Sequence, residues 1–138
     1  MDQTVIASKI DSLYRCISRI QHKTPELKTE LLEDIDLQDI IAVNLVRAVQ
    51  IAVDIGTHIN ADSDEPTPTT MGQVFNHLEK GNIIAPRTAN SMRSAVGFRN
   101  VSVHSYDTID WEIVWAIITQ HIKEFESYAL EISQHCGL

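Results

Sequence analysis

One long segment of the chain is apolar almost all round, and it constrains the fold more than any other feature. Residues 37–59 read LQDIIAVNLVRAVQIAVDIGTHI, and apolar residues occupy most of the circle when the segment is projected as a helix. We predict a central helix with Asp36 as its N-cap, enclosed by other helices.

The remaining helices are indicated by periodic apolar residues and by capping residues. Residues 3–22 carry one apolar stripe with spacings of three and four: Ile6, Ile10, Leu13, Ile17 and Ile20. Thr70 and Gly81 are typical of the start and end of a short helix, and Pro86 is typical of the first turn of another. We expect this helix to weaken around residues 101–103, and a last helix to follow Asp107 or Asp110.

Composition agrees with a single helical domain over residues 1–138. Hydrophobic residues make up 43% of the chain, and it contains only five Gly and four Pro. We therefore predict an all-α, up-and-down helical bundle. The segment NADSDEPTPTT, residues 60–70, is rich in Pro, Ser, Asp and Thr and predicts a mobile loop. The sequence shows no secretory signal and no apolar run that we judge long enough for a membrane, so we expect a cytoplasmic protein without membrane contact.

The segment GFRNVSVHSY, residues 97–106, holds three chemically capable side chains: Arg99, His104 and Tyr106. Arginine offers a planar charged fork for phosphate, and histidine exchanges protons near neutral pH. If the helix ended between them, His104 would fold back toward Arg99, and the pair could cleave RNA without a metal. On spacing alone, a helix-end arginine with a surface histidine is the competing interpretation, and Tyr106 fits either an exposed role or packing against the bundle.

The central helix carries a narrow polar stripe. Asn44, Arg47, Asp54 and His58 fall within about 80° of one another at 100° per residue. A polar stripe on a buried helix needs partners. It forms either an internal network, in which Arg47 pairs with Asp54, or the lining of a cleft or subunit interface shared with Arg99 and His104.

Net charge is −8, which opposes broad nucleic-acid binding, so RNA recognition requires specific cations. Arg15, Arg19 and Lys23 are spaced by four and form one basic face of the first helix. This face is either ordinary solvated surface or a track for RNA phosphates. The histidines lack metal-ligand spacing and there is no Gly-rich phosphate loop, so we expect neither a metal nor a cofactor.

The stretch FRNVSVHSY resembles the HEPN superfamily, and more closely its HepT-type ribonuclease toxins. The pattern Arg-x-x-x-x-His-x-Tyr is met by Arg99, His104 and Tyr106, and Asn100 after the arginine also fits. The resemblance extends over roughly residues 5–130, including the central and closing helices.

The resemblance implies a homodimer with two Arg-His motifs facing one cleft, and metal-independent endoribonuclease activity that leaves a 2′,3′-cyclic phosphate. It also implies a partner, an MNT-type nucleotidyltransferase antitoxin of a type VII toxin–antitoxin system, which transfers AMP from ATP to Tyr106. Arg99 would bind phosphate, His104 would transfer protons, and Asn44, Arg47, Asp54 and Asn100 would line or support the cleft.

Two other functions remain open from the sequence. The chain could be a non-catalytic HEPN module that binds nucleotide or docks a nucleotidyltransferase, which suits its acidic charge. It could also be a helical homodimer whose polar stripe only sets pairing specificity.

Overall fold

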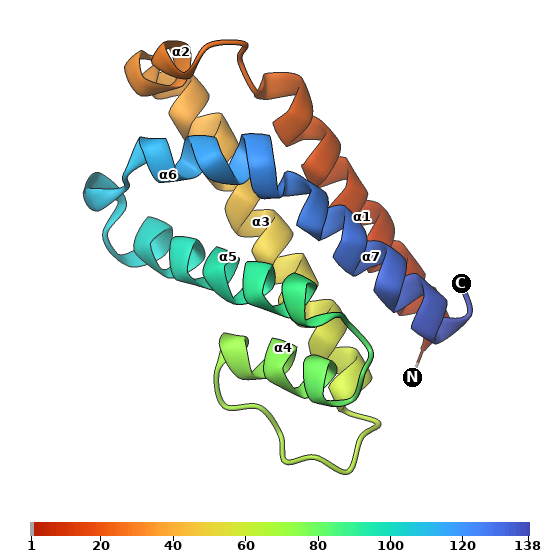
Figure 1. Ribbon diagram of the computed structural model, residues 1–138. Helices are drawn as coiled ribbons and strands as arrows, with labels where there is room; N and C mark the ends of the chain where they lie inside the picture. Colours follow the sequence, from red (N-terminus) through yellow and green to blue (C-terminus); the bar gives the residue numbers. More distant parts are fainter. Residues whose placement is uncertain (1) are drawn as a thin grey trace.

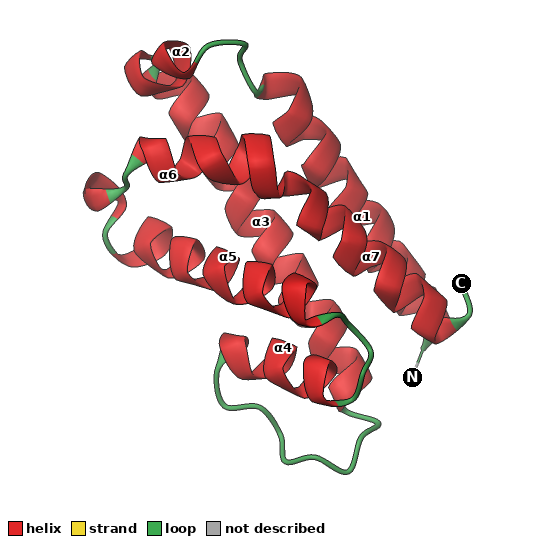
Figure 2. Ribbon diagram, in the orientation of Figure 1, coloured by secondary structure: helices red, strands yellow, loops and turns green. Residues whose placement is uncertain are grey.

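A computed structural model describes residues 2–138, and this part of the chain contains helices and loops but no strand (Figure 2). The prediction of an all-helical fold is confirmed. The elements are α1 (Gln3–Lys23), α2 (Lys28–Glu33), α3 (Ile35–Asn60), α4 (Met71–Lys80), α5 (Pro86–His104), the 3-10 turn η1 (Tyr106–Thr108), α6 (Trp111–Ala116), the π-helical turn η2 (Ile117–His121) and α7 (Ile122–Cys136).

The helices pack as an up-and-down bundle around α3, which contacts α1, α4 and α5 (Figure 1). α1 and α7 run antiparallel side by side, and α5 crosses in front of α3. The two chain ends meet at one end of the bundle, where Gln3 Nε2 donates a hydrogen bond of 2.6 Å to the carbonyl oxygen of Cys136. The turn η1 lies at the opposite side of the molecule (Figure 1).

The core is built from the residues that the helical periodicity selects. The predicted stripe of α1 is buried along its whole length: Ile6, Ile10, Leu13, Ile17 and Ile20. On α3, Gly56 allows close packing, because a Cβ atom there would lie 2.4 Å from Cγ1 of Val74. The fully buried Tyr128 donates a hydrogen bond of 2.7 Å to the carbonyl oxygen of Ala52.

Most of the capping predictions are confirmed, but the start of α3 is different. Thr70 caps α4, Gly81 ends it and Pro86 occupies the first turn of α5. The N-cap of α3 is Asp34, whose carboxylate accepts a hydrogen bond of 3.0 Å from the Leu37 amide. The prediction of Asp36 was wrong because Asp34 has the extended backbone that a cap requires, whereas Asp36 lies inside the first helical turn.

The expected weakening of α5 around residues 101–103 was also wrong. The helix continues to His104, and the Ser105 amide still donates to the carbonyl oxygen of Val101 at 2.8 Å. A valine lowers helix stability by less than about 0.7 kcal/mol relative to alanine, so Val101 and Val103 are not sufficient to end a packed helix. Arg99 and His104 therefore belong to one continuous helix.

The last helix begins after Asp110, which caps α6 through the Glu112 amide, and this decides between Asp107 and Asp110. The helix is interrupted by η2, where the Thr119 hydroxyl donates to the carbonyl oxygen of Trp115 at 2.6 Å. Such π-helical turns insert a local bulge into a helix.

The structure bears on two further predictions: the absence of an apolar run long enough for a membrane, and a mobile loop at residues 60–70. By length and composition α3 meets the requirement for a membrane-spanning helix, contrary to the expectation that no apolar run is long enough, yet twelve of its 26 residues are buried within the bundle. Residues 61–70 connect α3 to α4 without a helix or strand. The mobility of this loop stays a prediction.

Candidate functional site

Arg99 is half-buried near the C-terminal end of α5, and its guanidinium is only partly satisfied. Its Nη1 donates a hydrogen bond of 3.2 Å to the side-chain oxygen of Asn100. Its Nε is buried and has no hydrogen-bond partner within residues 2–138. Leaving a buried donor unsatisfied costs about 1–3 kcal/mol, and more for a charged group. This donor is therefore suited to an incoming anion.

His104 is the last residue of α5, and its imidazole is exposed. It makes no hydrogen bond or ion pair with any residue of the described chain. Because α5 is continuous, five residues turn the helix by about 500°, which leaves His104 about 140° away from Arg99 around the helix axis. The two side chains therefore do not converge within one copy of the chain, contrary to the fold-back that the sequence suggested.

Tyr106 begins η1, and its hydroxyl donates a hydrogen bond to the Asp39 carboxylate in the second turn of α3. Its ring also makes a T-shaped contact with the Trp111 ring, with centroids 6.0 Å apart and planes at 68°. Partial burial, and then the hydrogen bond and charge of Asp39, raise the pKa of Tyr106 to about 12. The side chain is still 38% exposed, so its hydroxyl remains within reach of a partner.

The polar side chains of the α3 stripe differ in burial and in their partners, and they do not form one network. Asn44 is buried, and its amide nitrogen donates to the carbonyl oxygen of Ile40 at 2.8 Å. Asp54 is half-buried, lies 3.7 Å from Lys9 Nζ and accepts a hydrogen bond of 3.3 Å from Gln50. Within the described chain it forms no ion pair with Arg47, so the alternative of an internal network built on that pair is not realised.

Arg47 is exposed, and its charge acts on Cys16 of α1. Burial raises the pKa of the Cys16 thiol, and the nearby charges of Arg47 and Arg15 partly oppose this rise. Both charges act on this thiol, and α3 packs against α1, so Arg47 lies on the side of α3 that faces α1.

The cations of the chain divide into paired and unpaired groups. Five of them form ion pairs with carboxylates: Lys9, Lys28, Lys80, Arg87 and Arg93. Within residues 2–138, no carboxylate forms an ion pair with any residue of a second group, which consists of Arg15, Arg19, Lys23, Arg47, Arg99 and Lys123. The second group contains Arg15, Arg19 and Lys23, the basic face predicted as a track for RNA phosphates, together with Arg47 and Arg99.

Asp39 is the residue that the sequence analysis missed. Extending the projection of α3 by one residue places Asp39 on the same side as Arg47, about 80° from it, so a weak signal was present. Its contact with Tyr106 joins residues 67 positions apart and depends on how η1 packs against α3.

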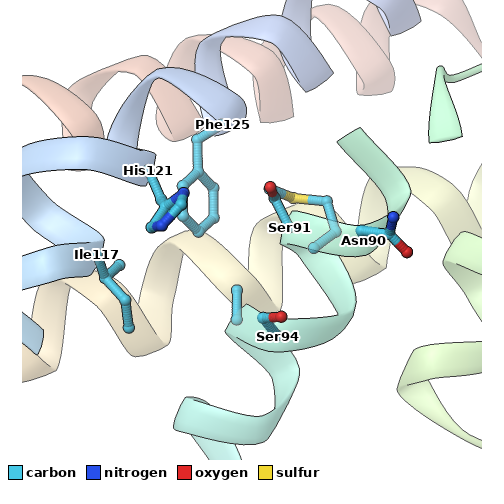
Figure 3. Close-up of a pocket in the computed structure, with 8 residues that line it drawn as sticks. Asn90, Ser91, Ser94, Ile117, His121 and Phe125 are labelled. Atoms are coloured by element: carbon cyan, nitrogen blue, oxygen red, sulfur yellow. The ribbon is translucent and has the colours of Figure 1, made fainter. Parts of the chain in front are cut away.

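A separate cavity lies between α5 and η2, away from the Arg-His motif. It has a volume of about 160 Å³, and its eight lining residues include neither Arg99 nor His104. In Figure 3, His121 and Phe125 face Ser91 and Ser94 across this space. Within residues 2–138, no group of three or more His, Cys, Asp or Glu side chains is placed to bind a metal ion. Metal-free chemistry stays a prediction.

Comparison with known proteins identifies the family. The family described as "Ribonuclease HepT-like" matches residues 13–132. The mRNA nuclease HepT of Shewanella oneidensis strain MR-1 is 31% identical over 124 residues, which cover 90% of this chain and 92% of the relative. The tRNA nuclease HepT of Aphanizomenon flos-aquae strain 2012/KM1/D3 is 29% identical over 99 residues, covering 71% of this chain and 67% of the relative.

A solved structure has the same fold. It contains a tri-AMPylated Shewanella oneidensis HEPN toxin in complex with an MNT antitoxin, and it matches with a TM-score of 0.89 and 30% identity. The match covers 97% of this chain and 99% of that one. The resemblance read from Arg99, His104 and Tyr106 is thus confirmed, and the chain belongs to the HepT-like ribonuclease family.

Proposed function

We propose that this chain is the ribonuclease toxin of a type VII HEPN/MNT toxin–antitoxin system. The observation that carries the proposal is the buried, unpartnered Nε of Arg99, five residues before the unpartnered imidazole of His104 on the same helix of the described chain. A guanidinium with an unsatisfied donor and a free imidazole can stabilise charge and transfer a proton, which are the two roles that metal-free phosphodiester cleavage uses. The HepT nucleases among its relatives support the same activity.

In the proposed reaction, His104 removes the proton from a ribose 2′-OH of the RNA. The 2′ oxygen attacks the adjacent phosphorus, the bond to the 5′ oxygen of the next nucleotide breaks, and a 2′,3′-cyclic phosphate remains. Arg99 stabilises the charge that develops on the phosphate, and Asn100 orients Arg99 through its hydrogen bond. No step uses a metal.

The enzyme works as a homodimer. Because Arg99 and His104 point about 140° apart on a continuous α5, one copy does not direct both groups at one phosphate. Two motifs facing one another provide both groups, and they also provide a second histidine to protonate the leaving oxygen. The exposed side chains of Val101 and Val103, at 40% and 50%, lie on the same helix end and favour its burial by a second copy.

RNA approaches along the unpaired cations of α1 and α3. Arg15, Arg19, Lys23 and Arg47 have no carboxylate partner in the described chain, so their charge is available to phosphates. A local basic surface of this kind is what RNA recognition by a chain with a net charge of −8 requires. Asn44 and Asp54 brace α3 behind it.

The antitoxin neutralises the enzyme by transferring AMP to Tyr106. The tyrosine lies two residues after His104 and is partly exposed, so the phosphate of an attached AMP adds negative charge beside the catalytic pair and repels RNA. The related toxin in complex with an MNT antitoxin is tri-AMPylated, which supports this mode of control. Both proteins act in the cytoplasm.

A cleavage assay with purified chain and a chelator tests the proposal. We expect RNA fragments ending in 2′,3′-cyclic phosphate, and far fewer such fragments from His104→Ala. Co-expressing Arg99→Ala with His104→Ala tests the shared site, since mixed dimers keep one of each group and should regain part of the activity. If the chain binds its antitoxin but cleaves no RNA, either as the wild-type dimer or as the mixed dimer, it is the non-catalytic docking module.

A further inference from the structure

The hydroxyl of Tyr106 is held by two elements that are far apart in sequence. It donates its hydrogen bond to Oδ1 of Asp39 on α3, and the ring makes a T-shaped contact with Trp111 at the start of α6. Both contacts are made at the surface, where Asp39 is exposed and Tyr106 is 38% exposed. The direction of the O–H bond is therefore fixed before any partner arrives.

This environment makes the phenol less acidic than an ordinary tyrosine. Burial and the neighbouring carboxylate raise the pKa of Tyr106 to about 12, so only about one molecule in 10⁵ carries a phenolate at pH 7. A neutral phenol is a weak nucleophile. Its proton has to leave as the new bond forms, which requires a base within hydrogen-bond reach.

We propose that Asp39 is that base: it accepts the proton of Tyr106 when the tyrosine receives AMP. The phenolic oxygen attacks the α-phosphorus of ATP, and the O–H proton passes to Oδ1 of Asp39. The bond between the α-phosphorus and its bridging oxygen breaks, and pyrophosphate leaves with the electron pair. The toxin thus supplies a catalytic group for its own modification. This inference rests on the proposed function, in which Tyr106 is the AMP acceptor.

The proposal makes the first transfer different from later ones. When a second AMP is added to the same tyrosine, the acceptor is a hydroxyl on the ribose of the first AMP. That hydroxyl lies one nucleotide away from the phenolic oxygen, which is the atom that contacts Asp39. Loss of Asp39 should therefore slow the first transfer and leave later transfers nearly unchanged, so each molecule provides its own control.

Asp36 offers a matched control on the same helix. It is an exposed aspartate in the first turn of α3, three residues before Asp39, and it makes no hydrogen bond to Tyr106. Asp36→Asn removes the same charge from the same surface. A difference between Asp36→Asn and Asp39→Asn thus reports the contact with the hydroxyl rather than the field of the acidic surface.

The experiment follows AMP addition by intact-mass time courses, using the full chain, its antitoxin and ATP. For Asp39→Asn and Asp39→Ala we expect the kcat of the first transfer to fall about 100-fold, with little change in the KM for the toxin. Asp39→Glu should recover part of the rate, and Asp36→Asn should stay within about twofold of wild type. Thermal unfolding followed by circular dichroism checks that each variant is folded.

Two results would overturn the inference: a first transfer in Asp39→Asn and Asp39→Ala that is as fast as in the wild type, or an equal slowing of every transfer. The antitoxin would then supply the base. Tyr106→Phe separates this failure from failure of the proposed function. If Tyr106→Phe still gains AMP, the acceptor is another residue and the assignment of Tyr106 itself is wrong.

Discussion

Arg93 and Arg99 lie six residues apart on α5, but their surroundings are opposite. The guanidinium of Arg93 donates hydrogen bonds to Glu79, Asn76 and Asn90, and its Nη1 lies 2.9 Å from the Glu79 carboxylate. The guanidinium of Arg99 reaches only Asn100 in the described chain and leaves its Nε unsatisfied. The half of α5 around Arg93 is therefore tied to α4, while the half that ends at His104 keeps binding capacity unused.

Substitution of the two motif residues at the C-terminal end of α5 should have the largest effect. We expect His104→Ala to lower the RNA cleavage rate about 10²–10⁴-fold and Arg99→Ala about 10²–10³-fold, because they lose proton transfer and charge stabilisation respectively. Initial rates on a labelled RNA measure both. Arg93→Ala is the control on the same helix and should cleave within about threefold of wild type. If Arg99→Ala cleaved RNA at the wild-type rate, the two arginines would not differ in function.

Substitution of a buried residue in the half of α5 around Arg93 should change stability instead of cleavage. Met92 is 1% exposed in the core beneath α5. Met92→Ala should lower the free energy of unfolding by about 2–5 kcal/mol, because it removes buried apolar packing and leaves a cavity. Urea unfolding gives this value, and cleavage per folded molecule should remain close to wild type. A large loss of cleavage in fully folded Met92→Ala would show that the two halves of α5 are coupled.

The salt dependence of RNA binding tests the same contrast between unpaired and paired cations. We expect Arg15→Gln combined with Arg19→Gln to make the plot of log K against log salt for RNA binding shallower by about 1.4, at about 0.7 for each phosphate that is no longer neutralised. Binding is measured with His104→Ala to prevent cleavage. Arg87→Gln with Arg93→Gln removes two charges that are already in ion pairs. An equal change in slope for the two double variants would show that the effect depends only on net charge.

The smallest expected effect is on the ion pair itself. Arg93 and Glu79 are about one-third exposed, so water and salt screen their attraction. Arg93→Ala should lower the free energy of unfolding by less than about 1 kcal/mol, measured in the same urea experiment as Met92→Ala. A larger loss would mean that the hydrogen bonds to Asn76 and Asn90 act with the ion pair as one network.

The helices were predictable because their signals are local. The apolar spacing of Ile6 to Ile20 and the caps at Thr70, Gly81 and Pro86 involve residues a few positions apart. The errors arose where two local signals competed or where packing decided. Asp34 and Asp36 are both capable caps, and only the backbone conformation distinguishes them. The π-helical turn η2 and the continuity of α5 through Val101 depend on the neighbouring helices.

The candidate site was predictable in its residues but less so in its connections. Arg99, His104 and Tyr106 stand close together in sequence, so their spacing and the family resemblance identify them. The Asp39 contact joins two helical segments 67 residues apart, and no spacing rule reports it. The absence of a pair between Arg47 and Asp54 in the described chain likewise depends on where α1 places Lys9.

The meeting of the two chain ends has a practical consequence for work in living cells. Gln3 bonds to the carbonyl of Cys136 at one end of the bundle, across the molecule from η1 (Figure 1). A fluorescent reporter or affinity tag fused at either terminus would therefore extend away from Tyr106 and its surroundings. The molecule can be visualised or captured from that side without obstructing access to the opposite one.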